Sequence, residues 1–129
     1  LDVPLQYLNG VLHKRCICFV LSDFQLSIPE TTLRIVAKRH DVIGIQILDP
    51  LEISMKNVGL IHLVDAENGS RMTMDTADQH WIKAHESLQS VHQQKTKTAF
   101  VKSKADFLAI DIRNSYISTL LQFFKRRSK

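Results

Sequence analysis

The hydrophobic residues in the first half of the chain alternate between helical spacing and short continuous runs. Leucines three and four residues apart predict a helix over residues 4–13 with one apolar stripe. Continuous apolar runs at 16–21 and 42–48 predict strands that are buried on both faces, as in a parallel sheet. Between them, Ser27 and Glu30 form a capping box that predicts the start of a second helix. This order of strand, helix and strand indicates a right-handed parallel crossover.

A hairpin is predicted in the middle of the chain, where the pattern changes. Two β-like runs, at 60–64 and 71–74, flank a polar loop that contains Asn68 and Gly69. Asn-Gly between two such runs is typical of a hairpin, although this loop is longer than two residues. We expect the hairpin to lie at an edge of the main sheet or outside it.

Helical spacing returns after the hairpin. Thr76, with Gln79 three residues later as its capping partner, predicts the start of a long helix. The mostly polar stretch 93–104 predicts that this helix frays or breaks there. A third buried strand is predicted over 107–110, or as far as 112, and a last helix from about Asn114. The pattern therefore predicts an α/β fold with a parallel sheet and flanking helices.

Composition agrees with one globular domain over residues 1–129. The chain has 129 residues, 44% hydrophobic and 23% charged, with no linker and no internal repeat. These values exclude a disordered tail, a collagen-like repeat and a disulfide-rich miniprotein. No apolar run approaches the ~18 residues that a membrane span needs, and the first ten residues lack the features of a signal peptide.

The net charge of +4 does not by itself indicate nucleic-acid binding. The basic residues are spread along the chain, except in the last few positions, where cations suit the end of a helix. An interface for nucleic acid could use the lysines at 95–104 together with Arg126 and Arg127. We do not favour it, because few aromatic residues lie between these charges.

The two cysteines predict a reducing compartment. Cys16 and Cys18 are two residues apart in a predicted strand, so their side chains point to the same face without disulfide geometry. They are predicted to be reduced thiols in a cytoplasmic protein. No further soft ligand lies at a zinc-like spacing, and the six histidines form no metal-binding motif.

Three aspartates lie at or near the ends of the predicted buried strands: Asp23, Asp49 and Asp111. Ligands of open parallel sheets bind outside the carboxyl ends of the strands, and carboxylates gathered there suit Mg²⁺. The alternative is structural, because an aspartate at a strand end also caps the next helix or forms a turn. Asp49 precedes a proline, which is typical of a turn, and Asp111 can lie inside its strand.

These aspartates leave an enzyme open as a second hypothesis. A Mg²⁺-dependent phosphoryl-transfer enzyme or hydrolase would need all three carboxylates in one coordination sphere. We expect that they do not meet, since neighbouring strands are ~4.8 Å apart and Asp111 comes earlier in its strand. Ser22 precedes Asp23 without a paired histidine, and no nucleophile elbow, P-loop or deaminase motif is present.

The order of several segments resembles a known family. The segments are LQYLNGVLHKRCICFVLSDF at 5–24, RHDVIGIQILDPLE at 39–52, VGLIHLVDAENGSRMTMDT at 58–76 and SYISTLLQFFKRR at 115–127. Together they resemble the C-terminal part of the bacterial proteins called domain of unknown function 58. These are von Willebrand factor A-like proteins, commonly encoded beside a MoxR-type AAA+ ATPase. The resemblance covers nearly the whole chain.

The resemblance implies a Rossmann-like fold, part of a von Willebrand A-like domain. The strand that ends in SDF would be the fourth strand of that domain, VIGIQIL the fifth and FLAIDI the sixth. The hairpin at 60–75 would be an insertion of this family. The chain would then be a fragment, the C-terminal half of the domain, cut inside a larger protein.

The resemblance also implies a metal-dependent adhesion site in the intact protein. Such a site needs a D-x-S-x-S loop, a threonine from a later loop and an aspartate after the fourth strand. Only the aspartate has a counterpart here, Asp23, so Mg²⁺ is expected in the intact protein and no cofactor in this chain. Ser22 and Asp23 would face the partner, which would supply a carboxylate.

The function that this implies is a non-enzymatic protein-interaction module. It would act with a MoxR-type AAA+ ATPase in chaperone-like assembly of complexes. The absence of the earlier strands would leave one apolar edge of the sheet unpaired, and such an edge favours pairing with a second copy. We therefore expect a homo-oligomer that forms through this edge.

Overall fold

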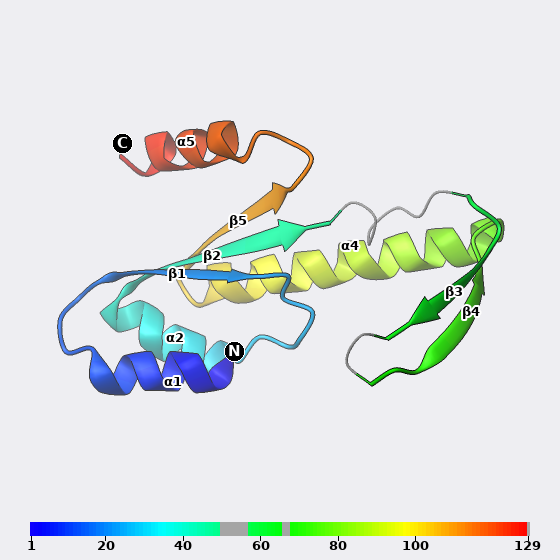
Figure 1. The fold of residues 1–129 in the computed structure, drawn as a ribbon. Helices are drawn as coiled ribbons and strands as arrows, with labels where there is room; N and C mark the ends of the chain where they lie inside the picture. Colours follow the sequence, from blue (N-terminus) through cyan, green and yellow to red (C-terminus); the bar gives the residue numbers. More distant parts are fainter. Residues whose placement is uncertain (50–56, 66–67, 129) are drawn as a thin grey trace.

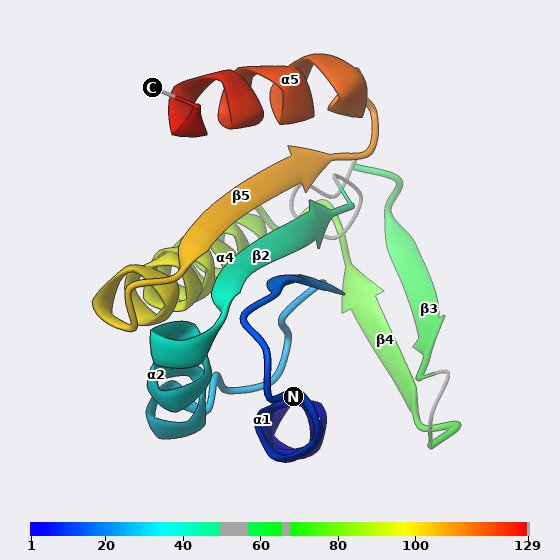
Figure 2. The same cartoon turned by 90° about the vertical axis from the view of Figure 1, so that its left-hand side faces the viewer.

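The main sheet consists of three parallel strands with helices on both faces (Figures 1 and 2). The structure is a computed structural model that describes residues 1–49, 57–65 and 68–128. The strands are β1 (Ile17–Ser22), β2 (Asp41–Leu48) and β5 (Asp106–Asp111), in the spatial order β1-β2-β5. On one side lie α1 (Asp2–Val11), α2 (Glu30–Arg39) and α4 (Gln79–Lys102), and on the other α5 (Tyr116–Arg127). This arrangement confirms the predicted α/β class and is consistent with a Rossmann-like fold.

Each face of the sheet has its own hydrophobic core, because successive side chains of a strand point to opposite faces. Val42 of β2 packs among residues of α1, α2 and α4, including Phe100. Its neighbour Ile43 packs on the other face, against Phe123 of α5. Gly44 lies on the α4 side, where a Cβ atom would come within 2.5 Å of the Phe100 ring. The glycine therefore permits the close approach of helix and strand.

The prediction that β1 is buried on both faces is wrong. Among the described residues β1 pairs with β2 alone, and its side chains alternate between exposed and half-buried. Ile17, Phe19 and Leu21 are 46–62% exposed, because α5 covers β2 and β5 and reaches β1 chiefly through a Phe19–Phe124 ring contact at 6.2 Å. The continuous apolar run at 16–21 therefore belongs to an edge strand, and α5 leaves one of its faces largely uncovered.

The hairpin lies outside the main sheet, which is one of the two predicted positions. Strands β3 (Leu60–Val64) and β4 (Arg71–Asp75) pair antiparallel as a separate sheet beside the first turns of α4 (Figure 1). The buried Thr76 hydroxyl donates to Gly59 O and accepts from Val58 N, so it closes the base of the hairpin. Two residues of the predicted turn region, 66 and 67, lie outside the described residues.

Two predictions about α4 are wrong. The helix is continuous over Gln79–Lys102, because its polar stretch buries Thr96, Ala99 and Phe100 against the sheet and keeps its charges outward. Its N-cap is Asp78, whose carboxylate accepts from the main-chain N–H groups of His80 and Trp81, while Thr76 is used by the hairpin. No helix of the described residues has the length and apolar character that crossing a membrane requires.

Two other helices also begin later than the sequence predicts. Helix α2 starts at Glu30 with Pro29 in the N-cap position, and no side chain caps it, so the expected capping box does not form. Helix α5 starts at Tyr116 after Ser115 rather than at Asn114. The side chain of Ser115 makes no capping hydrogen bond either.

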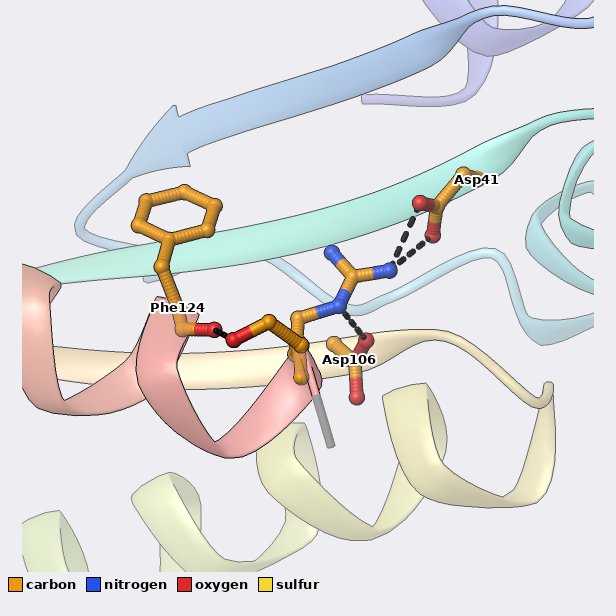
Figure 3. A network of polar contacts seen from close by, with 5 residues as sticks. Asp41, Asp106 and Phe124 are labelled. Atoms are coloured by element: carbon orange, nitrogen blue, oxygen red, sulfur yellow. Dashed lines mark hydrogen bonds and ion pairs between the residues drawn. The ribbon is translucent and has the colours of Figure 1, made fainter.

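A network of ion pairs fastens the end of α5 to the start of the sheet (Figure 3). Arg127 donates from Nη2 to both carboxylate oxygens of Asp41 at 2.6 Å, and its Nε lies 3.1 Å from Asp106 Oδ2. Its guanidinium also lies 5.7 Å from the centre of the Phe123 ring. The basic end of the chain, whose last residue Lys129 is not described, thus has a specific role in docking α5.

Candidate functional site

The turn after β1 carries Asp23 and is folded by its own polar side chains. Ser22 Oγ accepts a hydrogen bond from Phe24 N at 2.9 Å and donates to Asp23 Oδ1 at 3.2 Å. The same Oδ1 accepts from Gln25 N at 3.2 Å. Asp23 therefore makes an Asx-type turn, which was the structural alternative to metal binding. Its side chain remains exposed at the carboxyl end of the sheet.

Phe24 locks this turn onto the rest of the molecule. Its backbone has a φ of +56°, a left-handed conformation that costs free energy for a residue other than glycine. Its ring is 3% exposed and packs edge-on against Phe100 at 5.2 Å. His92 of α4 donates from Nε2 to Phe24 O at 2.6 Å. The strained turn is thus held by these two contacts with α4, which fix the position of Asp23.

Gln46 is a buried amide beside the same turn. The register of the sheet places Ser22 opposite Gln46, and Gln46 donates from Nε2 to Asp23 O at 3.0 Å. The residue is 3% exposed. Its second polar atom, Oε1, is buried and has no hydrogen-bond partner among the described residues. A buried acceptor without a donor is uncommon in a folded protein, so this atom marks a place where a donor is expected.

A small pocket lies between the carboxyl ends of β1 and β2 and the first half of α4. It has a volume of about 90 Å³. Its walls include three carboxylates, from Asp23, Asp49 and Glu86, together with the amides of Gln46, Gln89 and Gln93. No lysine or arginine is among its lining residues in the described part of the chain. The pocket is therefore rich in hydrogen-bond acceptors and negatively charged.

The structure brings two of the three strand-end aspartates to this pocket. Asp111 is the last residue of β5, opposite Leu48 in the sheet, and it does not line the pocket. It pairs instead with Arg113 at 3.1 Å. The side-chain hydrogen bond from Arg113, and then its main-chain N–H, hold the pKa of Asp111 below its usual value. Glu86 from α4 takes the place in the pocket that the sequence suggested for Asp111.

The described residues do not by themselves fit Mg²⁺. No group of three histidine, cysteine, aspartate or glutamate side chains among them is close enough to hold a metal ion. Oδ1 of Asp23 is already used by Ser22 and Gln25 within its turn. A hard cation needs several oxygen ligands in one sphere. A metal ligand role for Asp23 in a longer protein stays a prediction.

Three residues of this site were not found from the sequence: Gln46, Glu86 and His92. A signal existed for Gln46, because it is the one polar side chain inside the apolar run of β2. Glu86 belongs to a stripe with Gln89, Ser90 and Gln93, three and four residues apart, which places these side chains on one helix face. His92 has no such signal, since its partner is a main-chain oxygen 68 positions away.

Comparison with known proteins identifies one matching family. The family described as "Protein of unknown function DUF58" matches residues 1–114. Uncharacterized proteins of Mycobacterium tuberculosis and Mycobacterium bovis are 36% identical over 70 residues, 54% of this chain and 22% of each relative. The chain thus matches about a fifth of the length of these curated relatives.

A further relative covers more of the chain. An uncharacterized protein of Mycobacterium avium is 25% identical over 118 residues, which is 91% of this chain and 69% of that protein. No solved structure matches the chain.

Proposed function

Since the chain belongs to the DUF58 family of proteins of unknown function, we propose that it is a non-enzymatic protein-interaction module. In this proposal the module acts with a MoxR-type AAA+ ATPase in chaperone-like assembly of complexes, and the sheet β1-β2-β5 is the C-terminal half of a von Willebrand A-like domain. Partners bind at the carboxyl end of the sheet, around Ser22 and Asp23. The cellular compartment that fits this role is the cytoplasm.

The observation that carries this proposal is the fixed, exposed presentation of Asp23. The turn that bears it is held by the buried Phe24 ring, by His92 and by Gln46, so the carboxylate has a defined position before any partner arrives. Pre-organisation of this kind lowers the entropy cost of association. A reactive group would instead need a base, a nucleophile or a metal beside it.

Apolar side chains around the turn also support a protein-interaction function. Leu26, which follows the turn, is 76% exposed, and Leu88 and Val91 of α4 are 70% and 51% exposed. Leu88 and Val91 line one hollow beside α4, and Leu26 lines the next. Exposed apolar side chains gathered next to a fixed polar group are typical of a protein-binding surface.

The enzyme hypothesis receives less support. A Mg²⁺-dependent phosphoryl-transfer enzyme or hydrolase would use Asp23, Asp49 and Asp111 together, whereas Asp111 is paired with Arg113 and does not line the pocket. Hydrolase activity is therefore an outcome that would contradict the interaction module.

The experiment is a direct binding measurement with a MoxR-type ATPase. Sedimentation velocity of the purified protein with the ATPase, in ATP and in ADP, is expected to show a complex in at least one nucleotide state. Asp23→Asn keeps the Oδ1 acceptor of the turn and removes the charge, so it should weaken the complex by about fivefold or more. Asp75→Asn also removes an exposed carboxylate, keeps the oxygen that accepts from Ala77 N, and lies outside these hollows, so it should leave binding unchanged.

Two outcomes would overturn the proposal. The first is no complex in either nucleotide state. The second is Mg²⁺-dependent hydrolysis of p-nitrophenyl phosphate that Asp23→Asn abolishes, which would bring the enzyme hypothesis to the front.

A further inference from the structure

The pocket beside Asp23 has a charge opposite to that of the chain around it. The chain carries 17 Lys+Arg against 13 Asp+Glu, a net charge of +4. The pocket nevertheless has three carboxylates, and neither lysine nor arginine, among those of its lining residues that the structure describes. Cations lie next to the pocket rather than in its described lining: Lys83 lines a neighbouring hollow with Glu86 and Ser90. The hydrogen bond to Asp111, and to a smaller extent the charge of Asp49, raise the pKa of Arg113. The acidic character is therefore local to this pocket.

The buried amide of Gln46 shows what kind of atom the pocket lacks. Nε2 of Gln46 is used by Asp23 O, which fixes the amide with Oε1 on its other side. Oε1 is buried and has no donor among the described residues. Leaving a buried acceptor unsatisfied costs free energy, and a ligand that moves the covering side chains aside and donates a hydrogen bond there would recover it. The unpaired oxygen of Gln46 indicates a ligand with N–H donors. Independently of it, the carboxylates indicate a ligand with a positive charge.

We propose that this pocket receives a basic side chain, arginine or lysine, from a protein partner, with Gln46 Oε1 and the carboxylates of Asp23 and Glu86 as its acceptors. The inference rests on the proposed function, and it names the chemistry of the partner at that site. Guanidinium and ammonium groups carry only donors and a full charge, which is what this set of acceptors matches.

The size of the pocket agrees with a side-chain head group. A cavity of about 90 Å³ exceeds the ~10–15 Å³ that one water needs, and it is below the ~300 Å³ of a typical small-molecule site. A guanidinium or ammonium group on the end of its chain fits this range. A nucleotide or another molecule of drug-like size does not.

The surface next to the pocket indicates what flanks the basic residue. Gln25 and Gln89 line both the pocket and a neighbouring hollow, whose other lining residues are Leu88, Val91, His92 and Lys95. The two hollows are therefore adjacent along α4. A partner segment with the basic residue in the pocket would place an adjacent residue over Leu88 and Val91, so we expect that residue to be apolar.

The first test uses a pair of peptides that differ only in charge. The probe is acetyl-Leu-Arg-Leu-amide, which has leucine on both sides so that chain direction does not matter, and the control peptide has citrulline in place of arginine. Citrulline keeps the shape and most donors but carries no charge. NMR titration at low salt should show shifts at the Gln46 side-chain amide, with the citrulline peptide about tenfold weaker.

Variants of the protein locate the binding. Glu86→Gln removes one carboxylate from the pocket and is expected to weaken binding of the arginine peptide by about threefold or more. Asp75→Asn, which removes a carboxylate outside the pocket and its neighbouring hollows, should have no effect. Gln46→Leu removes the unpaired acceptor and should also weaken binding. If this buried change prevents folding, the Glu86→Gln comparison decides alone.

The inference is overturned by equal binding of the two peptides, by no binding of the arginine peptide, or by equal binding to Glu86→Gln and the unchanged protein. Its failure is distinguishable from failure of the proposed function. A complex with the ATPase that is insensitive to Glu86→Gln would keep the interaction module and reject the pocket. Binding of the arginine peptide without any ATPase complex would keep the pocket and reject that partner.

Discussion

Nε2 of His92 lies 2.6 Å from the main-chain oxygen of Phe24, so the middle of α4 holds the turn that presents Asp23. The contact joins residues 68 positions apart and satisfies a carbonyl whose own residue has a φ of +56°. Without it the strained turn keeps the ring contact of Phe24 with Phe100 of α4 but loses its hydrogen bond to the helix. The orientation of Asp23 therefore depends on a side chain that touches neither Asp23 nor the pocket.

Replacement of His92 should loosen this turn. His92→Ala removes one hydrogen bond to a partly buried carbonyl, so we expect a loss of about 1 kcal/mol in the free energy of unfolding. Hydrogen exchange at the Phe24 and Gln25 amides should become faster than elsewhere in the protein. His92→Gln can place an amide N–H near the same oxygen and should restore much of the protection. Equal exchange in all three proteins would contradict the role given to His92.

Gly44 should not tolerate a side chain. A Cβ atom there would lie 2.5 Å from the ring of Phe100, which is fully buried and cannot move aside. We expect Gly44→Ala to destabilise the protein by about 1–3 kcal/mol, measured by urea unfolding. Gly10 in α1 is the matched control, since nothing lies within 4 Å of its added Cβ atom. Gly10→Ala should be neutral or stabilising by up to about 1 kcal/mol, as expected for glycine in a helix. A neutral Gly44→Ala would contradict this packing.

The sequence was sufficient for the parts of the fold that local pattern determines. Apolar runs identified β1 and β2, and the Asn-Gly turn identified a hairpin, although the sequence left open whether it lies at an edge of the main sheet or outside it. The burial of β1 on both faces was wrong, because an apolar run does not show which neighbours cover it. The predicted start of α4 was wrong for a related reason. Thr76 had the correct residue type for a cap, but a tertiary bond to Gly59 uses its hydroxyl.

The candidate site could be predicted only in part. The end of a strand is a local signal, so Asp23 and Asp49 were correctly placed near the carboxyl end of the sheet. Glu86 reaches the same pocket from a helix that the chain forms only after the hairpin, and its arrival depends on how α4 crosses the sheet. Spacing along the chain cannot predict that crossing. The unpaired acceptor of Gln46 is likewise a property of packing, not of sequence.

Arg127 should contribute more to stability than its neighbour Arg126. It pairs with Asp41 and Asp106 at the starts of two strands and lies over the Phe123 ring, whereas Arg126 is exposed. Its side chain is 27% exposed, so solvent screens the pairs only in part. We expect Arg127→Ala to cost about 1–2 kcal/mol in thermal or urea unfolding, and Arg126→Ala less than about 0.5 kcal/mol. Similar losses for both variants would mean that α5 is held by its apolar face alone.

The Asp111–Arg113 pair should be visible in the titration of Asp111. The side-chain and main-chain hydrogen bonds from Arg113 lower the pKa of Asp111 in the folded protein. A carboxyl whose folded pKa is lowered stabilises the protein above its unfolded pKa of ~3.9, and this contribution is lost as pH falls through the folded pKa. In Arg113→Gln the pKa of Asp111 should rise toward its usual value, as followed by carboxyl ¹³C NMR. An unchanged midpoint would contradict the pairing.

The edge formed by β1 should make the protein self-associate. Among the described residues this strand pairs on one side only, and Ile17, Phe19 and Leu21 leave an apolar row on its uncovered face. Two copies related by a twofold axis can pair their β1 strands antiparallel, which satisfies the free main-chain groups and places the two apolar rows side by side. Sedimentation velocity from micromolar to near-millimolar concentration should therefore show a growing fraction of dimer.

Phe19→Lys places a charge on this apolar row of β1 and should shift the equilibrium toward monomer. Val3→Lys changes a more exposed apolar residue on α1 and should leave the monomer–dimer equilibrium unaltered. A clean monomer throughout the concentration range, or equal behaviour of the two variants, would show that β1 is not the contact between copies.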